Sequence, residues 1–130
     1  VRNRTHVAMD GMGVFAFTMS KVPKCIKNLL ENFCIDVDEV DYLLLHQANQ
    51  YIDEKIRKKM RFSKDKTPYC LEKFGNTSSG TIPMTMVTKI SEQLRGGKNK
   101  LVMSGFGAGL SWAAVYVETE FIEVLPLIEI

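Results

Sequence analysis

Hydrophobic residues recur along this chain with different spacings, and each spacing predicts a type of secondary structure. Five apolar residues fall at helical spacing: Val22, Ile26, Leu29, Leu30 and Phe33. This stripe predicts an amphipathic helix that Ser20 can cap, with Pro23 tolerated in its first turn. Immediately before it, the aromatic and β-branched residues at 14–17 are typical of a short strand.

The next apolar run leads into polar residues. Residues 42–45 (Tyr-Leu-Leu-Leu) predict a buried parallel strand, and Asn49 is well placed to cap the helix that follows. That helix is expected to run to about Met60, with Ile52 and Ile56 on its buried side. The pattern therefore brings His46, at the end of the strand, close to the start of a helix.

The second half of the chain predicts one more helix and two more strands. Residues 71–74 are expected to be extended, and Ser78 or Ser79 to cap a helix that ends at Gly96-Gly97. The apolar stripe of that helix, with Pro83 in its first turn, is Ile82, Met86, Ile90 and Leu94. Residues 101–103 and 110–117 are predicted strands, and the apolar tail 121–130 is expected to pack against other parts of the protein.

This order of elements predicts an α/β fold with a partly parallel sheet, and 130 residues predict a single domain. Residues 1–10 are polar and without a pattern, and His6 among them is expected at the surface. The chain begins with Val1 rather than methionine, so we expect a fragment or a processed product.

Composition and charge narrow the possible partners. Hydrophobic residues make up 45% and charged residues 25%, as in ordinary soluble proteins. The formal net charge of +2 does not indicate nucleic acid, and no apolar run suggests a membrane span or signal peptide. The three cysteines, Cys25, Cys34 and Cys70, lack zinc-like spacing and favour a reducing cytoplasm. Cys25 and Cys34, beside the first apolar stripe, are predicted to be packing residues rather than nucleophiles.

Three polar or glycine-rich sites follow the predicted strands and are expected to converge on one pocket. They are His46, Asn76 after Gly75, and the region around Ala108. Each is weak evidence alone, because a histidine or asparagine is more often structural. Together, a neutral imidazole and a carboxamide can hold a developing oxyanion by hydrogen bonds. Such a pair suits chemistry that passes through an enolate.

Other sites are not favoured by the sequence. The glycines of 105–109 do not precede a helix, because residues 111–117 look like a strand, and dinucleotide binding is therefore rejected. These glycines more simply permit a tight turn and a close approach of the backbone to a ligand. No phosphate-binding loop, metal-ligand cluster or Gly-x-Ser-x-Gly motif is present in the sequence.

Three motifs in this order carry a resemblance to a known family. They are His46-Gln47-Ala48-Asn49, Gly75-Asn76-Thr77-Ser78, and Gly105-Phe106-Gly107-Ala108-Gly109-Leu110-Ser111-Trp112. Together they resemble the C-terminal half of β-ketoacyl-acyl carrier protein synthase III, over roughly residues 9–117. The related elongating ketosynthases carry a second histidine at the position of Asn76, and degradative thiolases a cysteine in the last turn. Plant-type polyketide synthases normally lack Gln-Ala-Asn after the histidine.

The resemblance implies the C-terminal half of a thiolase-like fold, with a mixed sheet packed against helices, and a two-step reaction that initiates fatty acid biosynthesis. An acyl group passes from acyl-CoA to a cysteine, and malonyl-acyl carrier protein, linked through phosphopantetheine, is decarboxylated and condensed with it. His46 and Asn76 would hold the malonyl thioester carbonyl and stabilise the enolate. The backbone N–H of Ala108, beside Gly107, would serve the oxyanion hole, and Phe106 would lie near the departing carboxylate. No bound cofactor or metal is implied.

The chain also departs from the family pattern. The nucleophilic cysteine of the family lies in the N-terminal half, which is absent, so the isolated chain is expected to be inactive and to self-associate through its uncovered apolar face. Tyr51 stands where well-studied members have an arginine that helps dock the carrier. A basic run could compensate, and the docking candidates are Asn49, Tyr51, Lys55, Arg57, Lys58 and Lys59. A solvated helix face is the equally favoured alternative, and Asn49 more simply positions the helix start.

The partners implied are the N-terminal half of the same enzyme, acyl carrier protein and a second copy in a homodimer, in the cytoplasm, with neither nucleic acid nor membrane. Two alternatives stay open at this point. One is a non-catalytic half-domain that binds acyl carrier or completes a heteromer. The other is a secondary-metabolite condensing enzyme of the same superfamily. The length of the starter acyl chain cannot be read from this half.

Overall fold

The computed structural model describes residues 9–128. The residues at 1–8, which include the predicted surface histidine His6, and those at 129–130 lie outside the described part. The elements in chain order are α1 (Gly11–Asn32), the 3-10 turn η1 (Val37–Glu39), β1 (Tyr42–Leu45), α2 (Gln50–Lys59), α3 (Leu71–Phe74), the 3-10 turn η2 (Ser78–Gly80), α4 (Thr81–Lys89), α5 (Ser91–Gly96), β2 (Lys98–Gly107) and β3 (Ser111–Glu120).

The described strands form one mixed sheet in the order β1-β2-β3. Strand β1 runs parallel to β2, with Tyr42 opposite Leu101. Strand β3 returns antiparallel to β2, with Ser111 opposite Gly107. The predicted α/β fold with a mixed sheet is confirmed.

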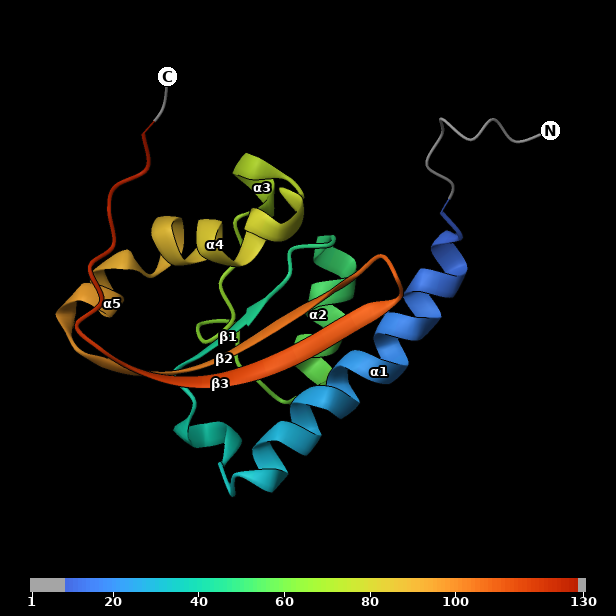
Figure 1. Cartoon of the computed structure of the whole chain (residues 1–130), viewed down its shortest axis with the longest axis horizontal. Coiled ribbons are helices and arrows are strands. Elements are labelled where there is room, and N and C mark those ends of the chain that lie inside the picture. Colours follow the sequence, from blue (N-terminus) through green and yellow to red (C-terminus); the bar gives the residue numbers. More distant parts are fainter. Residues whose placement is uncertain (1–8, 129–130) are drawn as a thin grey trace.

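Helices cover both faces of this sheet (Figure 1). Alternate residues of β1 point to opposite faces, which creates two apolar cores. Leu43 and Leu45 pack with residues of α1 and α2, whereas Leu44 packs with Ile90 and Leu94 on the side of α4 and α5. The sheet is thus the middle of three layers, and the carboxyl ends of β1 and β2 lie at the same edge.

Helix α1 begins much earlier than the sequence pattern predicted, so the prediction of a strand at residues 14–17 is wrong. Asp10 caps the helix by accepting a hydrogen bond from the backbone N–H of Gly13 at 3.0 Å. Phe15 and Thr18 then extend the apolar stripe by two turns toward the N-terminus. Packing against the sheet outweighs the weak strand propensity of this short run.

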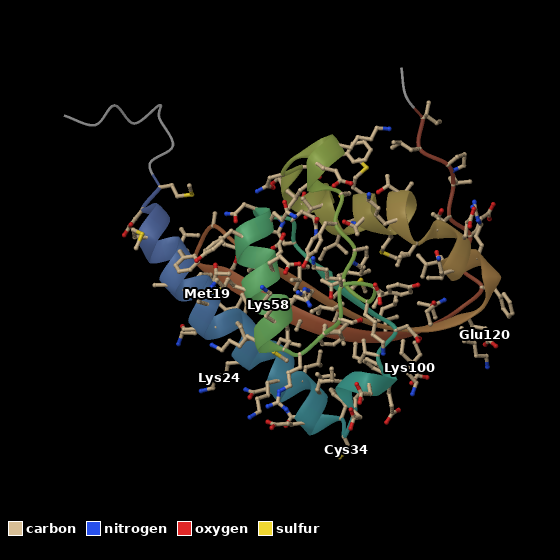
Figure 2. The ribbon with its side chains drawn as sticks, turned by 180° about the vertical axis from the view of Figure 1, so that it is seen from behind. Met19, Lys24, Cys34, Lys58, Lys100 and Glu120 are labelled. Atoms are coloured by element: carbon tan, nitrogen blue, oxygen red, sulfur yellow. The ribbon has the colours of Figure 1, made fainter. Side chains whose placement is uncertain are left out.

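Pro23 therefore lies in the middle of α1 and not in its first turn. A proline has no N–H, so the carbonyl of Met19, four residues earlier, lacks its usual partner within the helix. The ammonium group of Lys59 donates a hydrogen bond to that carbonyl at 2.9 Å. This bond joins α2 to α1, which run side by side in Figure 2, where Met19 and Lys58 are labelled.

The other boundaries were predicted with mixed success. Strand β1 and helix α2 are confirmed, and β2 and β3 are longer than expected. The extended segment predicted at 71–74 is wrong, because these residues form the helical turn α3. The single helix expected up to Gly96-Gly97 is divided at Ile90, whose ψ of 17° ends α4 and precedes α5.

The C-terminal tail packs in part as expected. Val124 is buried in the core beside Leu94, and Arg95 donates to its carbonyl at 3.0 Å. Of the cysteines, Cys70 is buried and Cys25 half-buried, but Cys34 is exposed. Cys34 sits at the end of α1 with φ of 53°, so its prediction as a packing residue is wrong.

Candidate functional site

The sheet places His46 directly after β1, at the edge where β2 also ends. The backbone N–H of His46 donates to the carbonyl of Ser104 at 2.8 Å and continues the parallel pairing beyond the strand. Its own carbonyl accepts from the N–H of Ala48 at 2.9 Å. These two bonds fix the backbone from which the imidazole projects.

The imidazole of His46 is half-buried and held on two sides. Its Nδ1 lies 2.8 Å from the hydroxyl oxygen of Thr81, the first residue of α4. The ring of Phe106 lies edge-on to it, with a distance of 5.3 Å between ring centroids. Burial lowers the pKa of His46 below its ordinary value of 6.5, although the carbonyl of Ser78 acts in the opposite direction. The direction of this shift favours the neutral ring.

Asn76 approaches the same space from the turn after α3. Gly75 has φ of +62°, a conformation that favours glycine, and this brings the chain out of the helical turn. The side-chain oxygen of Asn76 accepts from the N–H of Ser78 at 2.9 Å, and its amide nitrogen lies 3.5 Å from the carbonyl of Ala48. With its oxygen occupied and one N–H directed to the carbonyl of Ala48, the carboxamide has one further N–H to donate.

The turn between β2 and β3 forms another wall. Gly109 has φ of +136°, and a Cβ built there would lie only 3.0 Å from the backbone nitrogen of Ser111, so the turn requires glycine. A Cβ at Gly105 or Gly107 would meet nothing within 4 Å. These two glycines leave open space beside the backbone, and the predicted role in the close approach of a ligand stays a prediction.

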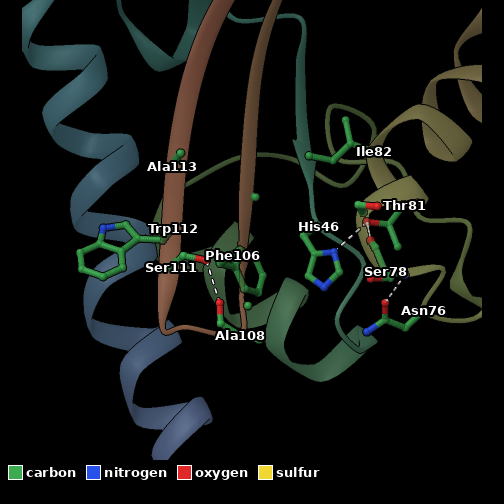
Figure 3. A pocket seen from close by; sticks show the side chains of 13 residues that line it. His46, Asn76, Ser78, Thr81, Ile82, Phe106, Ala108, Ser111, Trp112 and Ala113 are labelled. Atoms are coloured by element: carbon green, nitrogen blue, oxygen red, sulfur yellow. Dashed lines mark hydrogen bonds between the residues drawn. The ribbon is translucent and has the colours of Figure 1, made fainter.

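His46, Asn76, Phe106, Gly107 and Ala108 all line one open cavity of about 950 Å³ (Figure 3). The other residues that line it are Ser78, Ser79, Thr81, Ile82, Gly105, Ser111, Trp112 and Ala113. A second cavity of about 740 Å³ shares His46, Asn76 and the turn with it. It also reaches the start of α1, at Asp10 and Gly13, and the start of α2, at Asn49 and Ile52. The three predicted sites thus lie together.

The residues that line the 950 Å³ cavity include neutral hydrogen-bond donors and no Asp, Glu, Lys or Arg side chain. Such groups can stabilise negative charge that develops on a carbonyl oxygen, without a strongly bound ground state. None of the three cysteines lines either cavity. Over residues 9–128, no group of three or more His, Cys, Asp or Glu side chains is placed to hold a metal ion.

The predicted docking residues on α2 divide into two groups. Asn49 accepts from the N–H of Ile52 at 2.9 Å and so acts as the helix cap, as expected. Tyr51, Lys55, Lys58 and Lys59 are exposed, and the ammonium group of Lys55 lies 5.3 Å from the centre of the Tyr51 ring.

Arg57 does not belong to this surface, so its predicted exposure is wrong. The residue is only 8% exposed and donates to the carbonyl of Phe62 at 2.6 Å. It also pairs with the carboxylate of Glu54 at 2.8 Å and 3.1 Å. Position 57 is on the same helical face as the buried Asp53, which is why a count of basic residues misplaces it.

Sequence reasoning missed two residues that support the site, Ser78 and Thr81. Ser78 was considered only as a helix cap and as part of a family motif, and Thr81 was not considered. Thr81 Oγ1 donates to the carbonyl of Ser78 at 3.1 Å while it also contacts His46. The bond goes to the backbone of Ser78, and α4 begins after Gly80 without a side-chain cap, so the prediction that Ser78 or Ser79 caps this helix is wrong.

No helix in the described part of the chain is long and apolar enough to cross a membrane.

Comparison with known proteins places the chain. Its residues 30–119 match the family described as 3-oxoacyl-[acyl-carrier-protein (ACP)] synthase III C terminal. The chain belongs to this family. It is 40% identical over 114 residues to the beta-ketoacyl-[acyl-carrier-protein] synthase III of Streptococcus gordonii. The aligned region covers 86% of this chain and 35% of that protein. The resemblance stated from the motifs is confirmed.

Solved structures agree with this assignment. The fold is similar to that of a 3-oxoacyl-(acyl-carrier protein) synthase from Burkholderia xenovorans, with a TM-score of 0.87, 32% identity and coverage of 91% of this chain and 34% of that one. A priming beta-ketosynthase from a polyketide biosynthetic pathway gives a TM-score of 0.77, 26% identity and coverage of 88% and 34%. The chain spans about a third of the length of the synthase III relatives it matches.

Proposed function

We propose that this chain is the C-terminal catalytic half of a synthase III enzyme that condenses an acyl-CoA starter with malonyl-acyl carrier protein in the initiation of fatty acid synthesis. The observation that carries the proposal is the presence of His46 and Asn76 in one cavity, both oriented by hydrogen bonds to η2 and α4. Membership of the family supports the reaction class.

In this proposal His46 and Asn76 donate hydrogen bonds to the carbonyl oxygen of the malonyl thioester. When carbon dioxide leaves, that oxygen becomes the enolate oxygen and its charge is stabilised by the same two donors. Phe106, which packs against His46, gives the departing carboxylate an apolar surrounding that favours the loss of charge. The N–H of Ala108 serves the oxyanion formed when the enolate attacks the acyl-cysteine.

The nucleophilic cysteine would come from an N-terminal half of the same enzyme, because none of the described cysteines faces the cavity. The thiol attacks the acyl-CoA thioester, CoA leaves as the thiol, and the acyl-cysteine is later attacked by the enolate carbon. The chain alone is therefore expected to be inactive. A homodimer in the cytoplasm, without bound metal or cofactor, completes the proposal.

The roles of the two donors can be tested in the full-length protein that carries these residues. His46→Ala or Asn76→Ala should slow malonyl-carrier decarboxylation by about 100-fold or more, as loss of an oxyanion donor does. Acyl transfer from acyl-CoA to the cysteine should be largely retained. Ser79→Ala, which alters the same cavity without removing a proposed donor, is the matched control. Equal retention of both steps in the two donor variants would refute the assignment.

Docking of the acidic carrier protein on α2 is the second part of the proposal. Tyr51, Lys55, Lys58 and Lys59 form an exposed surface that begins beside Asn49, a residue lining the second cavity. A positive surface at a cavity entrance would speed the encounter with a negatively charged carrier. Arg57 has no part in this surface, because it is buried and paired with Glu54.

Charge reversal tests this docking surface. The double variant Lys55→Glu with Lys58→Glu should raise KM for malonyl-carrier more than KM for acyl-CoA, and the difference should shrink at high salt. Lys98→Glu, a single charge reversal at the far end of β2, should affect neither value. Equal effects on both substrates would contradict carrier docking and point to misfolding or to a merely solvated helix face.

One observation favours a related function. The fold also matches a priming beta-ketosynthase from a polyketide pathway, although at 26% identity rather than the 40% shared with the synthase III of Streptococcus gordonii. Condensation in a secondary-metabolite pathway would use the same donors with a different starter or carrier. Comparing kcat/KM for carriers of the two pathways in the full-length protein would distinguish them.

A further inference from the structure

Ser78 links the two proposed donors through its own peptide groups. Its N–H donates to the side-chain oxygen of Asn76 at 2.9 Å, and its carbonyl accepts from the hydroxyl of Thr81 at 3.1 Å. The hydroxyl oxygen of Thr81 in turn lies 2.8 Å from Nδ1 of His46 (Figure 3). Ser78 holds this position with φ of 56°, a left-handed conformation uncommon for a residue with a side chain.

The hydroxyl of Thr81 has one proton and two neighbours that can accept it. When the proton points to the carbonyl of Ser78, the hydroxyl oxygen accepts from Nδ1–H of His46. When it points to Nδ1, the ring must carry its proton on Nε2. Rotation of one hydroxyl therefore accompanies a change of tautomer in His46.

The two tautomers differ in what they offer the cavity. A neutral ring with its proton on Nδ1 presents a lone pair at Nε2 and cannot donate to a thioester oxygen. A ring with its proton on Nε2 can donate, but its Nδ1 lone pair then needs a donor. Among the described residues, Thr81 makes the one side-chain hydrogen bond to Nδ1, and the Ser78 carbonyl beside that hydroxyl is an acceptor, so without the hydroxyl no side chain would donate to Nδ1.

We propose that Thr81 is a positioning residue whose hydroxyl, by donating to Nδ1, stabilises the tautomer of His46 that donates from Nε2 to the substrate oxygen. The inference rests on the proposed function for its consequence in catalysis, but its claim about the ring does not need a substrate. Because the hydroxyl can donate either to Nδ1 or to the carbonyl of Ser78, both tautomers are accessible in the free protein, and we expect a thioester oxygen to select the Nε2–H form.

Among the residues that line the main cavity, His46 is the only one with an ionisable side chain. From β2 it meets the ring of Phe106, and from η2 and α4 it meets Ser78 and Thr81. Asp10 lines the adjoining cavity but uses its carboxylate to cap α1. Within this chain, a pH dependence that differs between the wild type and the variant without the hydroxyl therefore points to the ring, whereas a titration common to both proteins does not.

Three variants of the full-length protein test the inference. Thr81→Val removes the hydroxyl and keeps the branched shape, and Thr81→Ser restores the hydroxyl without the methyl group. Thr85→Val is the control for packing, since Thr85 is buried one turn along α4 and bonds to the carbonyl of Thr81 and the thiol of Cys70. The ring nitrogens of His46 are observed by nitrogen-15 NMR with labelled histidine, and assigned with a His46→Gln sample.

The expected result is a measurable fraction of the Nε2–H tautomer in the wild type, Thr81→Ser and Thr85→Val, and its loss in Thr81→Val. An amide-linked malonyl-pantetheine analogue should increase that fraction in all but Thr81→Val. Decarboxylation by Thr81→Val should fall by about 100-fold at neutral pH, the usual effect of a lost oxyanion donor. It should recover as the pH falls and the imidazolium gains N–H groups at both positions, whereas wild-type activity should not rise.

Equal tautomer fractions in the wild type and Thr81→Val would overturn the inference, whatever the activities are. Failure of Thr81→Ser to restore the wild-type tautomer would do the same. If the wild type neither decarboxylates malonyl thioesters nor responds to the analogue, the proposed function fails. A tautomer change confined to Thr81→Val would then still establish the role of the hydroxyl.

Discussion

Asp53 is a buried carboxylate without a hydrogen-bond partner, and its replacement by asparagine gives a sharp test of the packing of α2. The residue has no exposed surface, and neither side-chain oxygen has a partner within the described part of the chain. Burial, with a smaller effect of the neighbouring Glu54, raises the pKa of Asp53 from 3.8 to about 8. The folded protein therefore binds a proton that the unfolded chain releases.

The sign and size of the effect follow from this difference in pKa. Because the pKa of Asp53 is raised on folding, the stability linked to its protonation is fully present below pH 3.8 and is lost progressively as the pH rises toward 8. At about 1.4 kcal/mol per unit, the free energy of unfolding at pH 7 is lowered by about 4 kcal/mol. Asp53→Asn removes this loss but buries an unpaired carboxamide, which costs about 1–3 kcal/mol.

The variant should therefore be more stable than the wild type by about 1–3 kcal/mol at neutral pH, and no more stable in acid. Urea unfolding followed by far-UV circular dichroism, at matched chain concentrations and several pH values, measures this difference. Asp65→Asn, the same substitution at an exposed position, serves as the control. Destabilisation by Asp53→Asn at neutral pH would refute the reasoning and show that the carboxylate has a stabilising partner.

Further predictions concern the hydrogen bonds that anchor α2. Arg57→Met should lower the free energy of unfolding by about 1–3 kcal/mol, because the carbonyl of Phe62 loses its donor, and urea unfolding would show it. Asn49→Ala should cost about 1 kcal/mol through loss of the cap, whereas Asn49→Asp should retain most of it in the same assay. Lys59→Met should leave the Met19 carbonyl without this donor, so the backbone amides of α1 near Met19 should exchange their hydrogens faster. Unchanged amide exchange would contradict the bridging role of Lys59.

The sequence predicted those elements whose signals are local and strong. The apolar run at β1, the cap at Asn49 and the regular spacing of Ile52 and Ile56 each correspond to one physical requirement of a strand or helix. His46 and Asn76 could be brought together from sequence because parallel strands end at one edge and helix starts gather there. Their proposed roles stay predictions, since position does not establish chemistry.

The failures have tertiary causes. Residues 14–17 have the composition of a strand but form part of α1, because Phe15 packs against the same core cluster as Val22. Pro23 suggested a helix start, and only the contact from Lys59 shows how the helix continues through it. Likewise, Arg57 looks like its exposed neighbours in sequence, and its pairing with Glu54 and Phe62 becomes visible only when the chain is folded.

The central claim is that these residues form the decarboxylating half of a condensing enzyme. Its most direct test is to measure decarboxylation and condensation of malonyl-acyl carrier protein by the full-length gene product, beside the 130-residue chain alone. The account predicts activity in the full-length protein and none in the isolated chain, because the donors act on an enolate that needs an acyl-cysteine to attack. Retained carrier binding without activity in either protein would contradict it and identify a non-catalytic partner.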